Sequence, residues 1–339
     1  MNQVGMQLLE MCAADSSCSL TFGGKNVTDF MSTLFDKLFN KQTCKIVNAK
    51  KVTAAKLRFI LATLLTNRIT REVIPALLYR LNRCDDDMDI GVISFFFDTF
   101  EKNRAQLPSC VPLFSPMLQK HMIASELWQP TSTKQLQKLF DSTFFASDWV
   151  IQQQDIFEMW TNNELLYPQD AYFNKTFSTT TASVLLLNGK LDAQTPIKFA
   201  QESFALIEAP NKWLVEMPFA NHYVIGNSPT NASATTCGMS ILISFINNPL
   251  QQPDMSCAQT VIPVNFNGNP NSNKIYLGVE DIWNGLYYPT SEELKVSLWL
   301  FVGVESGTLL GAVSLLALAL FWVAELKVRG LKKTEYSQI

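Results

Sequence analysis

The sequence predicts a mixed α/β protein in which a short parallel sheet follows a long helical region. The apolar run Val184–Leu187 and the short segment Lys212–Met217 are predicted to be strands, and a helical stretch separates them. Strands that alternate with helices pair in parallel. Upstream, from Thr28 to about Gln169, nearly every segment instead shows the helical spacing of apolar residues.

The helical region divides into separate helices. Thr53 is a suitable N-cap for a helix over Ala54–Leu65, whose leucines and isoleucine recur on one face. Further helices are predicted over Arg71–Leu81, Asp87–Asn103 and Ser142–Trp160. The acidic run Asp85–Asp89 is expected to be a solvated helix start, where carboxylates offset the helix dipole, rather than a metal site. We expect no metal and no cofactor.

A polar residue follows each predicted strand. The first strand is expected to be buried and to end at Asn188-Gly189, which places Asp192 in the loop past its carboxyl end. A helix over Ile197–Ile207 and the second strand come next, and His222 follows them. This order is the closing half of a Ser…Asp…His catalytic arrangement. In it the acid holds the imidazole Nδ1–H, so that Nε2 can take a proton from a nucleophile.

The same residues carry a family resemblance. The run Leu185–Pro196 (LLLNGKLDAQTP), followed by a strand and His222, resembles the C-terminal part of the tripeptidyl and prolyl aminopeptidases, a branch of the α/β-hydrolase serine peptidases. The resemblance implies a partial α/β-hydrolase fold with Asp192 as the triad acid and His222 as the base. It also implies a peptide substrate with a free N-terminus. Where the family flanks this histidine with glycine, the chain has Asn221 and Tyr223.

The sequence contains no G-x-S-x-G nucleophile elbow. Its opening residues, Asn2–Cys12, resemble the segment that follows the elbow in the family. We therefore expect the second half of an enzyme, inactive by itself. Its expected parts are a segment over residues 1–27 that follows the nucleophile half, a helical cap over 28–170, and a C-terminal α/β-hydrolase portion over 171–290 that carries the acid and the base.

Within the expected cap, the resemblance singles out Glu126. Cap carboxylates of the related aminopeptidases receive the α-ammonium group of the substrate, which is a strong charge-assisted contact. A helix-capping or surface glutamate is an equally good interpretation of Glu126. His121 has no acid partner and no strand end beside it in the sequence, so we expect a surface or core residue there rather than a catalytic one.

Seven cysteines and three N-x-[ST] glycosylation sequons, at Asn26, Asn174 and Asn231, together indicate a secretory route.

The cysteines are only partly assigned by the sequence. The resemblance implies two disulfides, Cys12–Cys18 and Cys237–Cys257. Three cysteines remain, namely Cys44, Cys84 and Cys110. The sequence does not say how they pair, and one of them is left over.

Residues 297–324 are predicted to form a transmembrane helix. No residue between Ser306 and Ala324 is charged, and about 20 apolar residues suffice to cross a bilayer. Basic residues in the following tail, 325–339, favour a type I protein whose tail is cytoplasmic and whose globular part is lumenal or extracellular. The glycines in the helix stand four apart, which would allow a dimer contact through Gly303, Gly307 and Gly311. The tail ends in Tyr336–Ile339, which resembles an endosomal or lysosomal sorting signal.

Three functions are consistent with these patterns. The first is a membrane-anchored serine peptidase of the aminopeptidase type. The second is a catalytically dead membrane glycoprotein that binds peptides or a protein partner. The third is a lipase or esterase on the same scaffold, which would not need Glu126 to meet an ammonium group. A net charge of −3, without a basic run that interleaves aromatic residues outside the C-terminus, argues against a nucleic-acid partner.

Overall fold

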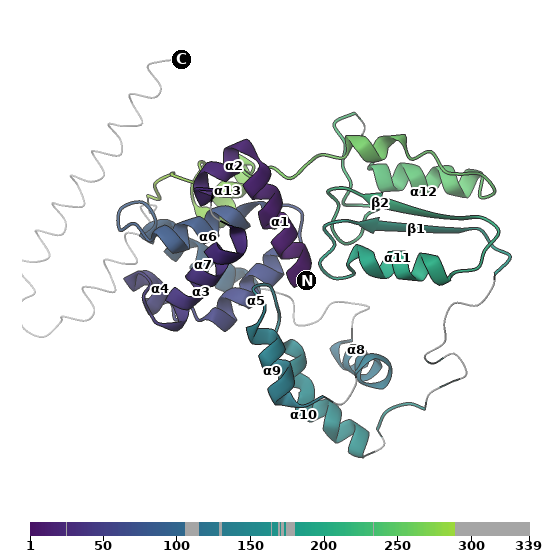
Figure 1. Ribbon diagram of the computed structural model, residues 1–339, viewed down its shortest axis with the longest axis horizontal. Helices are drawn as coiled ribbons and strands as arrows, with labels where there is room; N and C mark the ends of the chain where they lie inside the picture. The colour runs from purple at the N-terminus through teal and green to yellow at the C-terminus, as the bar shows by residue number, and fades with distance from the viewer. Residues whose placement is uncertain are drawn as a thin grey trace, which may run out of the picture. The chain divides into compact units, whose positions relative to one another are not determined.

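The computed structural model describes residues 1–288 apart from 25, 106–114, 129–130, 164, 169, 171–172, 174–179 and 233. The chain divides into two compact units, Met1–Leu286 and Tyr287–Ile339, and nearly all described residues belong to the first (Figure 1). Several predicted features lie outside the described residues, namely the membrane helix 297–324 with Gly303, Gly307 and Gly311, the tail 325–339, Asn174 and Cys110. Within the described ranges, no helix combines the length and apolar character needed to span a bilayer.

The first unit is mixed α/β and mostly helical. In chain order its elements are α1 (Asn2–Ala14), α2 (Ser16–Phe22), α3 (Val27–Phe39), α4 (Lys45–Ala49), α5 (Ala54–Leu65), the 3₁₀-helix η1 (Thr70–Val73), α6 (Ile74–Arg83), α7 (Ile90–Ala105), α8 (Pro116–Met122), the π-helix η2 (Ile123–Leu127), α9 (Thr133–Asp141), α10 (Trp149–Asn162), β1 (Val184–Gly189), α11 (Ile197–Leu206), β2 (Lys212–Met217), α12 (Cys237–Asn247), the 3₁₀-helix η3 (Ser256–Thr260) and α13 (Pro270–Leu277).

Helices α1, α3, α5, α6 and α7 pack against one another in a helical body (Figure 1). The predicted α5 is confirmed with its bounds and its cap, because the Thr53 hydroxyl oxygen accepts the Lys56 N–H at 3.1 Å. The predicted apolar face of α5 is buried, and its members are Leu57, Ile60, Leu61, Leu64 and Leu65. Burial of this face, rather than helix propensity, supplies most of the stability of such a helix.

The helix predicted from Ser142 begins only at Trp149, as α10. The backbone N–H groups of Phe144 and Phe145 donate to the Asn2 side-chain oxygen, at 2.8 and 3.1 Å. The N–H groups of this segment therefore bond to α1 instead of starting a helix. Local periodicity cannot reveal such a contact, because the two partners are far apart in the sequence. The stretch predicted as one helix over residues 71–81 is likewise divided, into η1 and α6.

Asp89 corrects the interpretation of the acidic run. Its side chain is fully buried rather than solvated, and it accepts hydrogen bonds from Arg80 Nη1 at 3.1 Å and Arg83 Nη2 at 2.7 Å. Arg80 is buried as well and donates to backbone carbonyls of segment 281–285 at 2.7–3.3 Å. The helix predicted from Asp87 begins at Ile90, after this ion network. No cluster of side chains suited to a metal ion occurs among the described residues.

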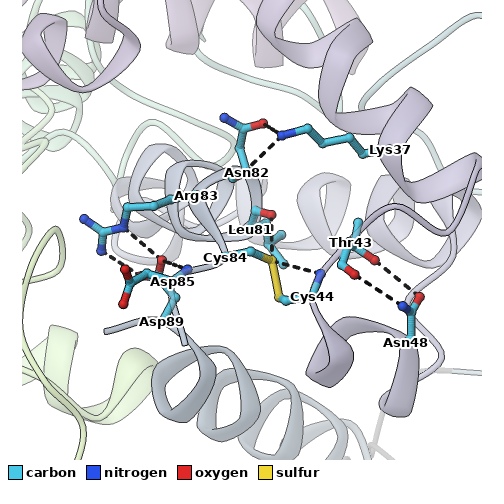
Figure 2. Close-up of a disulfide and its surroundings, with 10 residues drawn as sticks. All are labelled: Lys37, Thr43, Cys44, Asn48, Leu81, Asn82, Arg83, Cys84, Asp85 and Asp89. Carbon is cyan, nitrogen blue, oxygen red and sulfur yellow. Dashed lines mark hydrogen bonds and ion pairs between the residues drawn. A yellow bond between two sulfur atoms is a disulfide. The ribbon is translucent and has the colours of Figure 1, made fainter. Parts of the chain in front are cut away.

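Three disulfides join described residues, namely Cys12–Cys18, Cys44–Cys84 and Cys237–Cys257. The first and third are those that the resemblance implies, and the second answers the pairing that the sequence left open. Figure 2 shows Cys44–Cys84, which joins the start of α4 to the end of α6. Disulfides persist in oxidising compartments, so these three indicate an extracellular or lumenal environment.

The sheet consists of β1 and β2, which pair in parallel over their whole length, from Val184 opposite Lys212 to Gly189 opposite Met217. Helix α11 makes the crossover and packs against both strands, and α12 lies on the other side of them (Figure 1). The apolar run of β1 was expected to be buried, and this prediction is wrong. Its residues are half-buried, because β2 is the only strand that pairs with β1 among the described residues.

Candidate catalytic site

The loop after β1 lies tightly against the loop after β2. The Leu191 N–H donates to the Ala220 carbonyl at 3.1 Å. Gly189 ends β1 at the same place, and a Cβ on it would lie 2.1 Å from the Ala220 carbonyl oxygen. Only glycine permits this close approach of two backbones. As a result Asp192 and His222, from the two loops, meet at the carboxyl end of the sheet.

The Asp192 carboxylate is buried and held by donors on both oxygens. Its Oδ1 accepts the backbone N–H groups of Gln194 and Thr195, each at 2.9 Å. Its Oδ2 accepts the Thr195 hydroxyl at 2.7 Å and faces His222 Nδ1 at 2.9 Å. Three donors from the turn that follows Asp192 thus fix the plane of the carboxylate, independently of the imidazole.

The His222 ring is oriented through its Nδ1 atom. Besides Asp192 Oδ2, the Thr195 hydroxyl oxygen lies 3.2 Å from Nδ1. Since the carboxylate can only accept, the hydrogen-bond partners assign the proton to Nδ1 and leave Nε2 as the acceptor in the neutral ring. The side chain is 46% exposed, and no described residue hydrogen-bonds Nε2. This nitrogen is therefore available to take a proton from an incoming hydroxyl group.

A tight turn follows the histidine. Tyr223 has a φ of 62°, in the left-handed region where the family resemblance led us to look for glycine. The Asn227 side chain donates to the His222 carbonyl at 2.7 Å and closes the turn. Tyr223 therefore adopts a backbone conformation that is strained for a residue other than glycine.

Two buried side chains connect the histidine loop to the helical body. Arg71 in η1 donates through Nη2 to the Phe219 carbonyl at 2.6 Å, and Asn221 donates to the Thr66 carbonyl at 2.6 Å. Arg71 is only 1% exposed, and its burial lowers the pKa of its guanidinium group to about 10. Its Nε and Nη1 atoms have no hydrogen-bond partner among the described residues. Arg71 and Asn221 thus fix the backbone on the N-terminal side of His222.

The first turn of α1 lies within electrostatic range of the same site. Burial and the charge of Lys198 lower the pKa of the Met1 amino group, while the charge of Asp192 raises it. A helix N-terminus carries a partial positive charge and unpaired N–H groups. The charge of Asp192 is therefore felt at the start of α1.

Glu126 belongs to a different cluster. It is exposed on the π-helix η2, and its carboxylate accepts a hydrogen bond from the Tyr167 hydroxyl, which raises the pKa of Tyr167 to about 12. The neighbouring ring of His121 packs edge-on against Tyr167 and Trp160, and its Nε2 bonds the Leu165 carbonyl at 2.7 Å. Glu126 therefore has a phenol as its partner, and it does not hydrogen-bond the imidazole of His222.

Sequence reasoning missed two residues of the site. Thr195 stands three residues after Asp192. At this spacing a hydroxyl and a backbone N–H can both donate to the carboxylate, so the sequence did contain a signal for Thr195. Arg71 lies far upstream in a region interpreted as helical packing, and nothing in the local pattern connects it with Phe219.

The predicted glycosylation residues that the structure describes, Asn26 and Asn231, are both exposed. Asn26 is also the N-cap of α3, where its side-chain oxygen accepts the Thr28 and Asp29 N–H groups. Comparison with known proteins gives no relative: no family model matches the sequence, and neither a curated protein nor a solved structure matches it.

Proposed function

We propose that Asp192 and His222 are the orienting acid and the general base of a serine-type hydrolase. The observation that carries this proposal is the contact of 2.9 Å between Asp192 Oδ2 and His222 Nδ1, at the carboxyl end of a parallel β-α-β unit, with Nε2 unoccupied by any described residue. An acid that fixes the Nδ1–H tautomer and an exposed Nε2 are the two requirements for taking a proton from a nucleophile.

The proposed chemistry is acyl transfer. His222 Nε2 takes the proton of an attacking serine hydroxyl, and it later returns that proton to the leaving group. Asp192 keeps the ring in one orientation and stabilises the imidazolium that forms. The sequence has no G-x-S-x-G elbow, so the proposal needs a serine carried by a segment outside the described residues or by another polypeptide. A partial α/β-hydrolase sheet with unpaired strand edges would accept such a segment through backbone hydrogen bonds.

The proposed substrate is a peptide with a free N-terminus. Support comes from Glu126, an exposed carboxylate that accepts the Tyr167 hydroxyl, and from the ring of His121, which contacts the rings of Tyr167 and Trp160. An ammonium group can bind a carboxylate and aromatic faces together. We further propose a lumenal or extracellular site attached to the membrane through residues 297–324, in agreement with the three disulfides.

A fluorophosphonate probe tests the proposal, because it reacts only with an activated serine. The protein would be produced in secretory cells and isolated with any polypeptide that accompanies it. We expect labelling that is lost in His222→Ala and reduced by about 10⁴-fold in Asp192→Asn, the scale of a wrong-tautomer defect. His121→Ala is the matched control for labelling, because the probe carries no ammonium group and this readout does not depend on the proposed ammonium site.

One observation favours a second function. Because the sequence lacks the nucleophile elbow, the chain could act as a non-catalytic glycoprotein that binds peptides or a protein partner. Labelling that is absent, or equal in wild type and His222→Ala, would exclude the hydrolase and leave this alternative. A labelled protein that hydrolyses a carboxylic ester but cleaves neither the free nor the N-acetylated peptide would instead indicate an esterase or lipase.

A further inference from the structure

A pocket of about 360 Å³ lies in the helical body, between α5, the following turn, α7 and α13. Four aromatic residues line it, namely Phe59, Phe96, Phe100 and Tyr276. The Phe100 ring makes an edge contact with Phe59 (centroids 6.5 Å apart, planes at 84°) and a tilted one with Phe96 (6.1 Å, 30°). A cavity of about 150 Å³ already holds benzene, and ligand pockets begin near 300 Å³. The pocket therefore has room for a ligand larger than one ring.

Some polar groups of the pocket wall are already engaged. The hydroxyls of Thr63, Thr66 and Thr70 donate to backbone carbonyls at 2.7–2.9 Å. The Asn67 side-chain oxygen accepts the N–H groups of Ile69 and Thr70, at 2.8 and 3.3 Å, which leaves its NH₂ group as a donor. The wall thus offers aromatic faces and edges together with the polar side-chain groups of Asn67, Thr99, Asn103 and Tyr276.

The described residues that line the pocket carry no charge. A charged ligand would gain no counter-charge from these residues, and covering its charge with their rings would cost hydration. Aromatic rings instead gain from offset and edge-to-face contacts with other rings. We propose that this pocket is a binding site for a small, uncharged, bicyclic aromatic ligand, and that Asn67 donates a hydrogen bond to it.

The pocket wall is connected to the histidine loop by one hydrogen bond. Thr66 lines the pocket, and its carbonyl accepts the Asn221 side-chain N–H at 2.6 Å. Asn221 is 2% exposed and directly precedes His222. A ligand that displaces Thr66 must therefore displace a residue beside the imidazole. Binding itself does not depend on the proposed hydrolase activity.

Indole is the probe for the test, because it is an uncharged bicyclic aromatic molecule. Its binding to the ¹⁵N-labelled full chain would be followed by NMR titration. Thr99→Trp would fill the pocket from α7 and should weaken indole binding at least tenfold. Lys102→Trp places the same side chain on the same helix outside the pocket wall, and should leave the affinity unchanged.

A second measurement does not depend on any variant. Indole-3-carboxylate, which adds a charge to the same ring system, should bind at least tenfold more weakly than indole. The ligand proposal is overturned if indole shows no saturable binding, if the carboxylate binds as tightly, or if a folded Thr99→Trp keeps the wild-type affinity. The inferred connection between the pocket and the histidine loop is overturned if indole saturates the pocket without shifting the NMR signal of the Asn221 side-chain amide. Fluorophosphonate labelling tests the proposed hydrolase and indole titration tests the pocket, so the failure of one proposal is distinguished from the failure of the other.

Discussion

Removal of the Cys44–Cys84 disulfide should destabilise the protein by about 4 kcal/mol. The two cysteines are separated by 40 positions in the sequence. In the loop-entropy treatment, a cross-link that closes a loop of about this length restricts the unfolded chain by about 13 cal/mol/K, or about 4 kcal/mol at 25 °C. Both side chains are only half-buried, so replacement by alanine removes little packing. The loss of stability in Cys44→Ala/Cys84→Ala therefore reports mainly the loss of the cross-link and not a loss of packing.

The backbone conformation at Cys84 predicts a second, smaller change in the free energy of unfolding. Its φ of 53° lies in the left-handed region, at the C-cap of α6. A residue with a Cβ is disfavoured there by about 1–2 kcal/mol relative to glycine. The variant Cys44→Ala/Cys84→Gly should accordingly be about 1 kcal/mol more stable than Cys44→Ala/Cys84→Ala, although both lack the disulfide.

The assay is equilibrium unfolding in urea, followed by circular dichroism and tryptophan fluorescence. The denaturant slope m should rise when the cross-link is removed, because the unfolded chain expands and exposes more surface. A loss of stability below about 1 kcal/mol with unchanged m would refute the loop-entropy reasoning. A glycine variant no more stable than the alanine variant would refute the reasoning on backbone strain.

Three further predictions concern the ion network, the cap cluster and the site. Arg80→Met should lower the free energy of unfolding by about 3–5 kcal/mol, because it removes a buried charge partner of Asp89 and leaves backbone carbonyls unpaired; urea unfolding measures this, and no loss would contradict it. Glu126→Gln should lower the pKa of Tyr167 from about 12 towards its ordinary value, because the carboxylate no longer favours the protonated phenol; the tyrosinate absorbance should therefore develop at lower pH, and an unchanged titration would show that the bond does not form. Thr195→Val should slow fluorophosphonate labelling about tenfold, since it removes one hydrogen bond to a charged group; Thr195→Ser should retain the wild-type rate, and equal rates for all three would exclude a role for the hydroxyl.

The meeting of Asp192 with His222 could be predicted because each residue follows a strand in the sequence. Local rules suffice for this: an apolar run ends at Gly189, a polar turn follows, and the parallel pairing of two such runs brings their carboxyl ends together. The contact of Asp192 with His222 is the geometric consequence. The N-cap at Thr53 is local in the same sense, and it was also predicted correctly.

What could not be predicted depends on contacts between distant residues. The acidic run suggested that Asp89 is solvated. Asp89 is buried because it pairs with Arg80, which also donates to a backbone carbonyl about two hundred positions away. The late start of α10 depends on Asn2, at the other end of the helical region. Pairing of Cys44 with Cys84 is a choice among connectivities that spacing does not determine. In each case tertiary partners overrode a local pattern.

The sheet edges have a practical consequence for anyone who handles this protein. Within the described residues, each strand of the β1–β2 pair leaves one backbone edge without a partner strand. Exposed N–H and C=O groups along such an edge recruit strands from neighbouring molecules, which is a common origin of aggregation. Purification at low concentration, with light scattering to follow self-association, is therefore advisable, and a substance that caps the edge should prolong shelf life.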